Sequence, residues 1–448
     1  MKSFYIATFG CRTNQADSAA LRQDFLEGGY QETGKCQEAD VIVVNSCTVT
    51  QRSDQQVRQM ARRLRRGNPQ ARLLVTGCYA QRDPKAVAEV AGVDAVVGNT
   101  RKAELVQIAE GLPSRGKKGE LRIPGPSELA AVYSYDFSKL RAIDRSSATQ
   151  LGGKTRPFVK IQDGCDAKCS YCIIPSVRGP SRSVPPQQVI QQVRDLVEHG
   201  FQEIVLTGIH IGTYGMHLSP RYPLDRLLAE IVGIPGLGRL RISSIEPMEL
   251  SRRIIELAAG CGKIAPHFHI CLQSGSDRIL KRMLRPYNTA RFASIVEQIR
   301  QSIPEAAIGS DLIVGFPGET DSDHRASLDF VRQMPLTYLH VFPYSDRSGT
   351  RASSMPDKVS PQVRKERSRQ LRRLSEQKNR RFRRSFLKRR LSVLTLTDTE
   401  GAYRSGLSAN YLPVKLDRSV EGNRIVEGRA VREEAGALYL EPDFTQSR

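Results

Sequence analysis

Three cysteines lie within eight residues in the stretch "DGCDAKCSYCIIP" (163–175): Cys165, Cys169 and Cys172. Thiols at this spacing indicate metal ligation. A structural zinc site takes four ligands, usually as two pairs, and the next histidine is as far away as His199. An iron–sulfur cube held by three cysteines keeps one iron free for a substrate. The spacing therefore favours an iron–sulfur cluster over zinc.

Three further cysteines, Cys11, Cys47 and Cys78, each follow a predicted strand, in "YIATFGC", "VIVVNSC" and "LLVTGC". Parallel strands end at the same edge of a sheet about 4.8 Å apart, so three successive ends converge within roughly 10 Å. The alternative is three buried small residues, but their equivalent positions favour a second cluster. The other three cysteines show no pattern and receive no role: Cys36, Cys261 and Cys271.

The elements that must position these cysteines alternate strand and helix. In the first hundred residues, β-rich runs such as "SFYIAT" and "DVIVVN" are separated by helical patterns at 16–28 and 51–66. Such alternation predicts a parallel sheet covered by helices. A stretch from about 111 to 154, rich in Gly, Pro, Ser and charge, is predicted to be a linker.

The second block repeats the alternation six times, with predicted strands starting near 158, 203, 239, 267, 307 and 336. Six βα units predict an open or partial barrel, with its active site at the C-terminal strand ends. Short alternating strands after about residue 382 predict a small β-barrel of a kind that often binds nucleic acid.

A chain of 448 residues is expected to form two or three domains. The predicted fold class is α/β: an N-terminal parallel α/β domain, a central partial (βα)6 barrel and a C-terminal small β-barrel. The predicted boundaries are 1–112, a linker at 113–150, 151–380 and 381–448.

The net charge of +21 predicts a polyanionic partner. Residues 361–390 carry fourteen Lys or Arg against two Glu, and residues 51–70 carry six Arg against one Asp. A single charged run is as well explained by a solvated helix face, but two runs with a large global excess favour nucleic acid. The narrow apolar stripe of 361–390 makes a membrane surface the weaker interpretation.

The composition predicts a cytoplasmic protein with no membrane partner. No apolar run approaches the roughly 18 residues of a membrane span, and the opening "MKSFYIATFGCR" does not have the form of a secretory signal. Nine cysteines in 448 residues are too few for a disulfide scaffold, and an odd number argues for ligation or catalysis.

The three-cysteine spacing resembles the signature of the radical S-adenosylmethionine (radical SAM) superfamily. Over nearly its whole length the chain resembles the methylthiotransferase family, with its N-terminal cluster domain, radical SAM core and TRAM-type RNA-binding barrel. The motifs "GCRTNQADS", "VNSCTVT", "TGCYAQ", "LQSGSDRILKRM" and "DLIVGFPGET" appear in the family's order. The sequence around Cys47, together with "LTGIHIGTYG" and "GLSANYLPV", is most similar to the bacterial MtaB-type branch.

This resemblance implies methylthiolation of C2 of N6-threonylcarbamoyladenosine beside the anticodon of tRNA, giving 2-methylthio-N6-threonylcarbamoyladenosine. It also implies two 4Fe-4S clusters, one held by Cys165, Cys169 and Cys172, where SAM binds, and one by the three N-terminal cysteines. Cleavage of SAM yields a 5′-deoxyadenosyl radical. A radical is needed because C2 carries an unactivated C–H bond. The implied partners are the tRNA anticodon stem-loop, a reducing electron donor and a sulfur donor.

The superfamily resemblance further implies SAM contacts at the ends of the second, third and fifth strands of the barrel. The matching residues here are Thr207, Gly208, Ser244, Glu246, Gly315, Gly318 and Glu319. No catalytic residue beyond the cluster ligands is assigned. RNA contacts are expected from the basic helix and the start of the C-terminal barrel, through phosphates, at Arg380, Arg381, Arg383, Arg384, Lys388, Arg389 and Arg390. Tyr403 and Tyr411 are candidates for stacking on bases.

Three alternatives remain open at this point. One family branch modifies isopentenyladenosine in tRNA, and another modifies an aspartate of a ribosomal protein. The non-enzymatic alternative is an iron–sulfur RNA-binding sensor. That alternative does not explain why two sites would each keep an open iron. The positive charge favours an RNA substrate.

Overall fold

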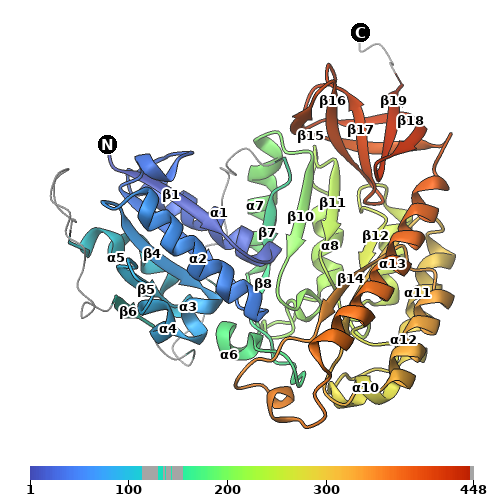
Figure 1. Ribbon diagram of the computed structural model, residues 1–448. Helices are drawn as coiled ribbons and strands as arrows, with labels where there is room; N and C mark the ends of the chain where they lie inside the picture. Colours follow the sequence, from blue (N-terminus) through green and yellow to red (C-terminus); the bar gives the residue numbers. More distant parts are fainter. Residues whose placement is uncertain (114–129, 135–136, 138–142, 144–154, 444–448) are drawn as a thin grey trace.

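The computed structural model describes residues 1–113, 130–134, 137, 143 and 155–443. Figure 1 shows an N-terminal sheet with its helices on the left, a partial barrel at the centre and, at the top right, a small β-barrel. Most of the predicted linker lies outside the described residues, but its residues 131–133 form a strand of the N-terminal sheet.

The N-terminal sheet has six parallel strands in the order β2-β1-β3-β4-β5-β6. Strand β3 is buried along its whole length. Its residues Ile42 and Val44 pack into one apolar core, while Val41 and Val43 pack into the other. Alternate strand residues point to opposite faces, so an uninterrupted apolar run is what a sheet covered on both sides requires. The predicted parallel sheet is confirmed.

The elements of this region are β1 (Ser3–Thr8), α1 (Arg12–Glu27), β2 (Gln31–Glu32), η1 (Cys36–Glu38), β3 (Val41–Ser46), α2 (Gln51–Gly67), β4 (Arg72–Gly77), α3 (Cys78–Arg82), α4 (Pro84–Ala88), β5 (Ala95–Val97), η2 (Asn99–Glu104), α5 (Leu105–Gly111) and β6 (Ala131–Tyr133).

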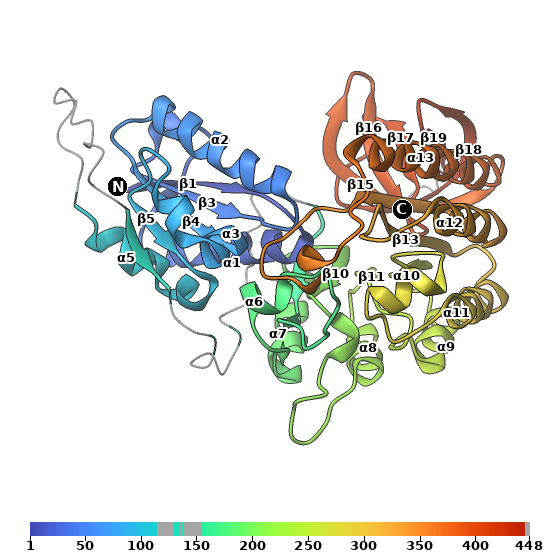
Figure 2. The same ribbon diagram turned by 60° about the horizontal axis from the view of Figure 1, so that its bottom comes forward.

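The central region contains all six predicted barrel strands in two parallel sheets, β11-β10-β7 and β12-β13-β14. Single bridges from Leu240 to Ile264 and from Ile245 to Ile270 join the two sheets. Among the described strands, β7 and β14 do not pair with each other, so the barrel is open between them. Helix α1 packs along β7 at this opening, which brings the N-terminal domain beside the barrel interior (Figure 2).

The central elements are β7 (Phe158–Lys160), β8 (Gln162–Asp163), α6 (Ile174–Arg178), β9 (Arg182–Ser183), α7 (Pro186–Glu198), β10 (Glu203–Thr207), η4 (Ile211–Thr213), α8 (Leu224–Val232), β11 (Arg239–Ile242), α9 (Arg252–Gly260), β12 (His267–His269), α10 (Asp277–Arg282), α11 (Thr289–Ser302), β13 (Ala307–Val314), α12 (Asp321–Gln333), β14 (Tyr338–Pro343), η5 (Arg351–Ser354) and α13 (Pro361–Arg384).

The two faces of the barrel strands differ in chemistry. In β14, Leu339 and Val341 are buried in the large core between strands and helices. Tyr338, His340 and Phe342 alternate with them on the opposite face, where Tyr338 meets other aromatic rings. Because side chains alternate along a strand, the interior of the barrel is lined by polar and aromatic groups while its outer face is apolar.

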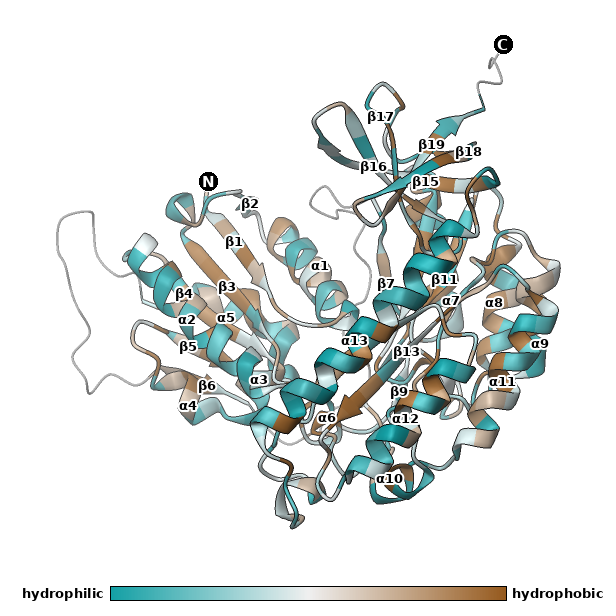
Figure 3. Ribbon diagram, turned by 45° about the vertical axis from the view of Figure 1, so that its right-hand side comes forward, coloured by the Kyte–Doolittle hydropathy of each residue, from teal (hydrophilic) through white to brown (hydrophobic). Residues whose placement is uncertain are grey.

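The C-terminal region closes into a five-stranded barrel in the order β15-β16-β17-β19-β18, as the short alternating strands predicted. Its strands are β15 (Arg390–Glu400), β16 (Tyr403–Ser408), β17 (Pro413–Asp417), β18 (Ile425–Glu434) and β19 (Ala437–Pro442). Helix α13 leads into this barrel and presents mostly hydrophilic residues along its length (Figure 3).

Candidate active site between two cysteine clusters

The three N-terminal cysteines lie after three neighbouring strands of the sheet. Cys47 directly follows β3, Cys78 directly follows β4, and Cys11 follows β1 after a two-residue turn. Strands β1, β3 and β4 are adjacent and parallel, so all three thiols lie at one sheet edge, as predicted. Cys47 and Cys78 are buried and Cys11 is exposed.

Glycines allow this close approach. Gly10 has φ +101°, and a Cβ added there would lie 2.9 Å from the sulfur of Cys47. Gly77 has φ +95°, and its added Cβ would lie 2.5 Å from the carbonyl oxygen of Ser46. Positive φ and tight contact both require glycine. The "FGC" and "TGC" sequences therefore bring the cysteines together.

The three N-terminal thiols also influence one another. Burial, together with the neighbouring thiols of Cys78 and Cys11, raises the pKa of Cys47 to about 12. A metal cluster would bind these cysteines as thiolates, so three thiols gathered at one place are suited to ligate one.

Asn14 fixes the loop that carries Cys11. It lies in the first turn of α1 and donates to the backbone carbonyls of Phe9 (2.8 Å) and Ser46 (2.9 Å).

The second triplet, Cys165, Cys169 and Cys172, lies on the loop between β8 and α6. The backbone N–H of Cys165 donates to Gly179 O (3.0 Å), and that of Cys172 donates to Cys169 O (3.1 Å). Burial and the two neighbouring thiols raise the pKa of Cys172 to about 12. The loop thus gathers three thiols at the C-terminal ends of the barrel strands, where the sequence predicted them.

A histidine and an arginine lie beside this loop. His210 Nδ1 lies 3.4 Å from the sulfur of Cys165, and Arg285 Nη1 lies 3.1 Å from the sulfur of Cys169. Arg285 also forms an ion pair with Glu246. Both side chains can donate hydrogen bonds to sulfur, so the loop lies among hydrogen-bond donors.

The spacing of the sulfur atoms argues against a single zinc ion at either triplet. Among the described residues, one set of three possible metal ligands has its ligand atoms within 4.8 Å of one another: His269, Asp311 and His340. Neither cysteine triplet meets this limit. Sulfurs sharing one zinc at about 2.3 Å would lie about 3.8 Å apart. Wider spacing fits a cluster whose irons are bound by separate thiolates.

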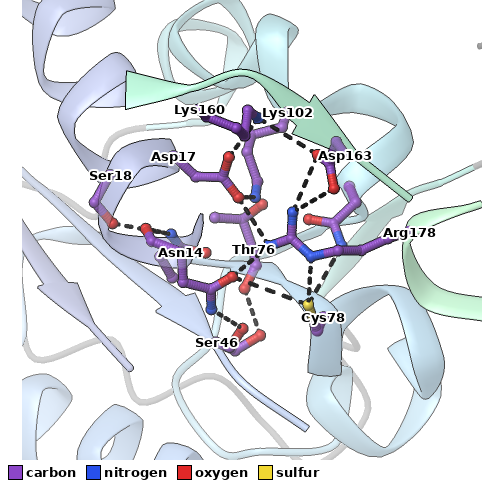
Figure 4. Close-up of polar contacts among 12 residues, drawn as sticks. Asn14, Asp17, Ser18, Ser46, Thr76, Cys78, Lys102, Lys160, Asp163 and Arg178 are labelled. Carbon is purple, nitrogen blue, oxygen red and sulfur yellow. Dashed lines mark hydrogen bonds and ion pairs between the residues drawn. The ribbon is translucent and has the colours of Figure 1, made fainter. Parts of the chain in front are cut away.

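Arg178 lies between the two cysteine sites, and Figure 4 shows its contacts with Cys78, Asp17 and Asp163. Its Nε lies 3.3 Å from the sulfur of Cys78, its Nη1 donates to Asp163 (2.9 Å), and its Nη2 donates to Asp17 (2.9 Å). Arg178 belongs to the helix that follows the second cysteine loop, whereas Asp17 and Cys78 belong to the N-terminal domain. Only 2 % of its side chain is exposed. This buried residue fixes one cysteine site relative to the other.

Two lysines complete the network between the domains. Lys160 Nζ lies 2.6 Å from Asp17 and 3.4 Å from Asp163, and Lys102 Nζ lies 3.0 Å from Asp17. Burial alone would raise the pKa of Asp17, but Lys102, Lys160 and Arg178 outweigh it and hold that pKa well below the usual range. Asp17 is therefore ionised and satisfied in the interface.

The residues predicted to contact SAM lie at the strand ends around the second cysteine loop. Thr207 is buried at the end of β10, and Ser244 is exposed after β11. A Cβ added to Gly208 would lie 3.0 Å from Gln162 O. Glu246 is linked through Arg285 to Cys169, which brings this part of the predicted set next to the cysteine loop.

The loop after β13 gives Glu319 a different role from the predicted cofactor contact. Its carboxylate accepts from the backbone N–H of Gly315 (3.0 Å) and from Arg367 of α13 (2.7 Å), and the residue is 7 % exposed. Gly318 has φ +79°, and an added Cβ would lie 2.7 Å from Arg282 Nη2. Glu319 thus supports the loop because its carboxylate is occupied by residues of this chain.

The comparisons with known proteins decide the family. A model described as "Uncharacterized protein family UPF0004" matches residues 3–98, and one described as "Radical SAM superfamily" matches residues 159–331. The threonylcarbamoyladenosine tRNA methylthiotransferase MtaB of Aquifex aeolicus is 36 % identical over 94 % of this chain and 98 % of that protein. The protein of the same name from Bacillus subtilis is 36 % identical over 98 % of this chain and 95 % of that protein.

The chain belongs to the radical SAM methylthiotransferase family. A relative of another name, the tRNA-2-methylthio-N(6)-dimethylallyladenosine synthase of Corynebacterium urealyticum, is 35 % identical over 84 % of this chain and 69 % of that protein. Among solved structures, the radical SAM methyltransferase TsrM of Kitasatospora setae matches with a TM-score of 0.55 at 16 % identity, covering 79 % of this chain and 77 % of that one. This likeness supports the fold alone.

In this methylthiotransferase the predicted RNA residues divide into three groups. Exposed and directed to solvent are Arg380, Arg381, Arg384 and Lys388. Arg389 and Arg390 are exposed but paired with Glu305 and Asp443. Arg383 is 8 % exposed and lies 3.1 Å from Glu433 of β18, so it fastens α13 to the C-terminal barrel. The prediction of a phosphate contact is wrong for Arg383, because its charge is already buried against a carboxylate.

Several residues of this site escaped the sequence analysis. Arg178 lies three residues after the stretch "DGCDAKCSYCIIP", and Asn14 lies inside "GCRTNQADS". An arginine six positions after Cys172, within the mostly apolar run "IIPSVRGP", is a signal that could have singled out Arg178. Tyr411 was considered for base stacking, but its ring stacks on His267 at 4.1 Å between centroids, inside the molecule. No helix in the described part of the chain is long and apolar enough to cross a membrane.

Proposed function

We propose that this methylthiotransferase modifies C2 of N6-threonylcarbamoyladenosine in the anticodon stem-loop of tRNA, giving 2-methylthio-N6-threonylcarbamoyladenosine. The observation that carries the proposal is the pairing of two three-cysteine sites across one buried interface, with Arg178 touching Cys78 on one side and following the Cys165–Cys172 loop on the other. The choice of nucleoside rests on the relatives named MtaB, which match over nearly their whole length.

The proposal assigns a 4Fe-4S cluster to each triplet: Cys11, Cys47 and Cys78 in the N-terminal domain, and Cys165, Cys169 and Cys172 in the core. SAM bound at the second cluster would supply the radical that C2 of adenine requires. The surrounding strand ends, with Thr207, Gly208, Ser244, Glu246, Gly315 and Gly318, would hold SAM. An electron donor and a sulfur donor complete the set of partners, and action on tRNA would take place in the cytoplasm.

The chain's own residues prepare the site. Arg285 and His210 place hydrogen-bond donors beside the thiols of Cys169 and Cys165. Arg178, Lys160 and Lys102 hold the N-terminal domain against the open side of the barrel through Asp17. This docking lets the sulfur-bearing site and the radical-forming site reach one nucleoside.

The RNA would bind along α13 and the start of the C-terminal barrel. Arg380, Arg381, Arg384 and Lys388 are exposed and would contact phosphates, which contribute affinity without reading sequence. The proposed domains follow the predicted boundaries: 1–112 for the cluster domain, 151–380 for the radical SAM core and 381–448 for the TRAM-type barrel, with strand β6 of the intervening segment added to the first sheet.

A second substrate is favoured by one observation, the 35 % identity with the dimethylallyladenosine enzyme of Corynebacterium urealyticum. The decisive experiment is mass spectrometry of nucleosides from total tRNA of cells with and without the gene. The proposal predicts loss of 2-methylthio-N6-threonylcarbamoyladenosine and accumulation of its precursor. Loss of the methylthio dimethylallyl nucleoside instead would support the second substrate, and no change in either would overturn both.

A further inference from the structure

The interior of the radical SAM barrel is closed at one end by a loop of the C-terminal barrel. Arg241 of β11 donates to the carbonyl oxygens of Ala409 (3.1 Å) and Ser408 (3.3 Å). In the same loop, the ring of Tyr411 stacks on His267, with ring centroids 4.1 Å apart and an angle of 14° between the ring planes. Tyr411 therefore forms part of the wall at the N-terminal end of the barrel interior.

Arg12 reaches this wall from the N-terminal domain. Its Nη2 donates to the hydroxyl of Tyr411 (3.1 Å), and its guanidinium lies 5.9 Å from the centre of that ring. Arg12 is half-buried and directly follows Cys11, a proposed cluster ligand. It is thus a cation inside the opening where the domains meet, tethered to the site that would carry sulfur.

The other cations of this wall have carboxylate partners, whereas Arg12 has none among the described residues. Glu203, which is fully buried, pairs with Arg156 (3.5 Å), Arg239 (3.2 Å) and Arg241 (2.8 Å). A half-buried guanidinium without a counter-charge is unusual, because burying an unpaired charge costs free energy.

The wall as a whole carries excess positive charge. Four guanidinium groups, of Arg12, Arg156, Arg239 and Arg241, face the carboxylates of Glu203 and Asp311, and Glu427 lies near Arg239, which leaves an excess of one positive charge. Asp311 is further bonded to His269 (2.9 Å) and His340 (3.3 Å), so it is not available to Arg12. The missing counter-charge is expected from a ligand.

The proposed substrate carries a suitable group. The threonylcarbamoyl substituent on N6 ends in a carboxylate, and N6 and C2 lie on either side of N1 along one edge of adenine. A substrate that presents C2 to the Cys11 site therefore brings its N6 substituent into the same opening. A dimethylallyl group is uncharged and gives Arg12 nothing to bind. Guanidinium and carboxylate form paired, charge-assisted hydrogen bonds.

We propose that Arg12 binds the carboxylate of the threonylcarbamoyl group and that Tyr411 holds the Arg12 side chain in place for this contact. The inference rests on the proposed function and deepens it, because it assigns the choice between N6 substituents to one residue. A contact between Arg12 and an RNA phosphate is the competing account, and the experiment separates the two.

The test measures binding of the protein with both clusters, without turnover, to anticodon stem-loops that differ in one nucleoside. One RNA carries threonylcarbamoyladenosine and the other carries its methyl ester, which removes the negative charge. The wild type is expected to bind the acid about tenfold more tightly than the ester, in line with a charge-assisted hydrogen bond. Arg12→Gln should abolish this preference because it weakens binding of the acid far more than binding of the ester, and Arg12→Lys should keep part of it.

Arg22→Gln is the matched control, since Arg22 lies on the same helix but pairs with Glu32 at 2.7 Å. It should retain the full preference, and iron content should be the same in all variants. Equal weakening of both RNAs by Arg12→Gln would indicate a phosphate or structural role and overturn the inference. Methylthiolation of the acid RNA by the wild type is measured alongside. If it occurs without any preference for the acid, the inference alone fails, and if it does not occur, the proposed function fails as well.

Discussion

The guanidinium of Arg178 lies 3.3 Å from the thiol of Cys78, although the two residues belong to different domains and stand 100 positions apart. The same side chain binds Asp163 of its own domain and Asp17 of the other. One buried arginine thus links the cysteine site of the N-terminal sheet to the loop that carries the second triplet. The relative position of the two sites is set by charge pairing as well as by packing.

Arg178→Ala should lower the stability of the fold and uncouple SAM cleavage from methylthiolation. Removing one member of a buried ion network leaves Asp17 and Asp163 short of a partner, which typically costs about 3 kcal/mol. We expect the variant to unfold at lower denaturant concentration and to cleave SAM with little methylthiolated product. Chemical denaturation and the ratio of 5′-deoxyadenosine to modified nucleoside measure the two effects.

Arg182→Ala is the control for this change, because Arg182 is close in sequence and donates to the backbone carbonyls of Pro180 and Arg178. It should keep a ratio near that of the wild type. An Arg178→Ala protein with wild-type stability and coupling would show that the interface network does not position the two sites.

The two cysteine triplets should fail in different ways. Cys169→Ala removes a proposed ligand of the SAM-binding cluster, so SAM cleavage should be abolished while the N-terminal cluster and tRNA binding remain. Cys47→Ala should retain SAM cleavage and lose methylthiolation, because the sulfur-bearing site is disrupted. Iron analysis and chromatography of both products test the pair. Survival of SAM cleavage in Cys169→Ala would contradict the assignment of that loop.

The exposed arginines of α13 should act through phosphates. Replacing Arg380, Arg381 and Arg384 together by Gln should weaken binding to all tRNAs alike and reduce the salt dependence of affinity by about one unit for each lost contact. Arg383→Gln should instead lower the free energy of unfolding and leave the salt slope unchanged, since Arg383 is buried against Glu433. A loss confined to one tRNA would speak against a phosphate role.

Asp17 should make the domain interface sensitive to acid. The pKa of Asp17 in the folded protein lies well below its ordinary value: burial opposes ionisation, but Lys102, Lys160 and Arg178 prevail. Its contribution to stability is therefore complete above the ordinary carboxyl pKa of about 4 and is lost as pH falls through the folded-state pKa. Urea unfolding should show a steeper loss of stability below about pH 4 for the wild type than for Asp17→Asn. If stability falls with pH equally in the wild type and in Asp17→Asn, the Asp17 carboxylate is not the origin of the acid sensitivity.

The sequence predicted the framework well because the framework is periodic. Buried runs such as "VIVVNS" and the glycines before Cys11 and Cys78 specify strands and their ends locally. The contact from Arg12 to Tyr411 joins residues 399 positions apart and depends on how three domains dock, which no local pattern reports. Arg383 was mistaken for a surface residue, although it follows Leu371 and Ser375 at multiples of four along the buried side of α13.

Removal of hydrogen from C2 is tested with an anticodon stem-loop whose threonylcarbamoyladenosine carries deuterium at C2. The reconstituted protein is incubated with this RNA, SAM and a reductant without oxygen, and the nucleosides and the 5′-deoxyadenosine are analysed by mass spectrometry. We expect the nucleoside to gain a methylthio group and to lose its deuterium, which should appear in 5′-deoxyadenosine. Formation of 5′-deoxyadenosine free of deuterium beside an unchanged nucleoside would contradict this expectation.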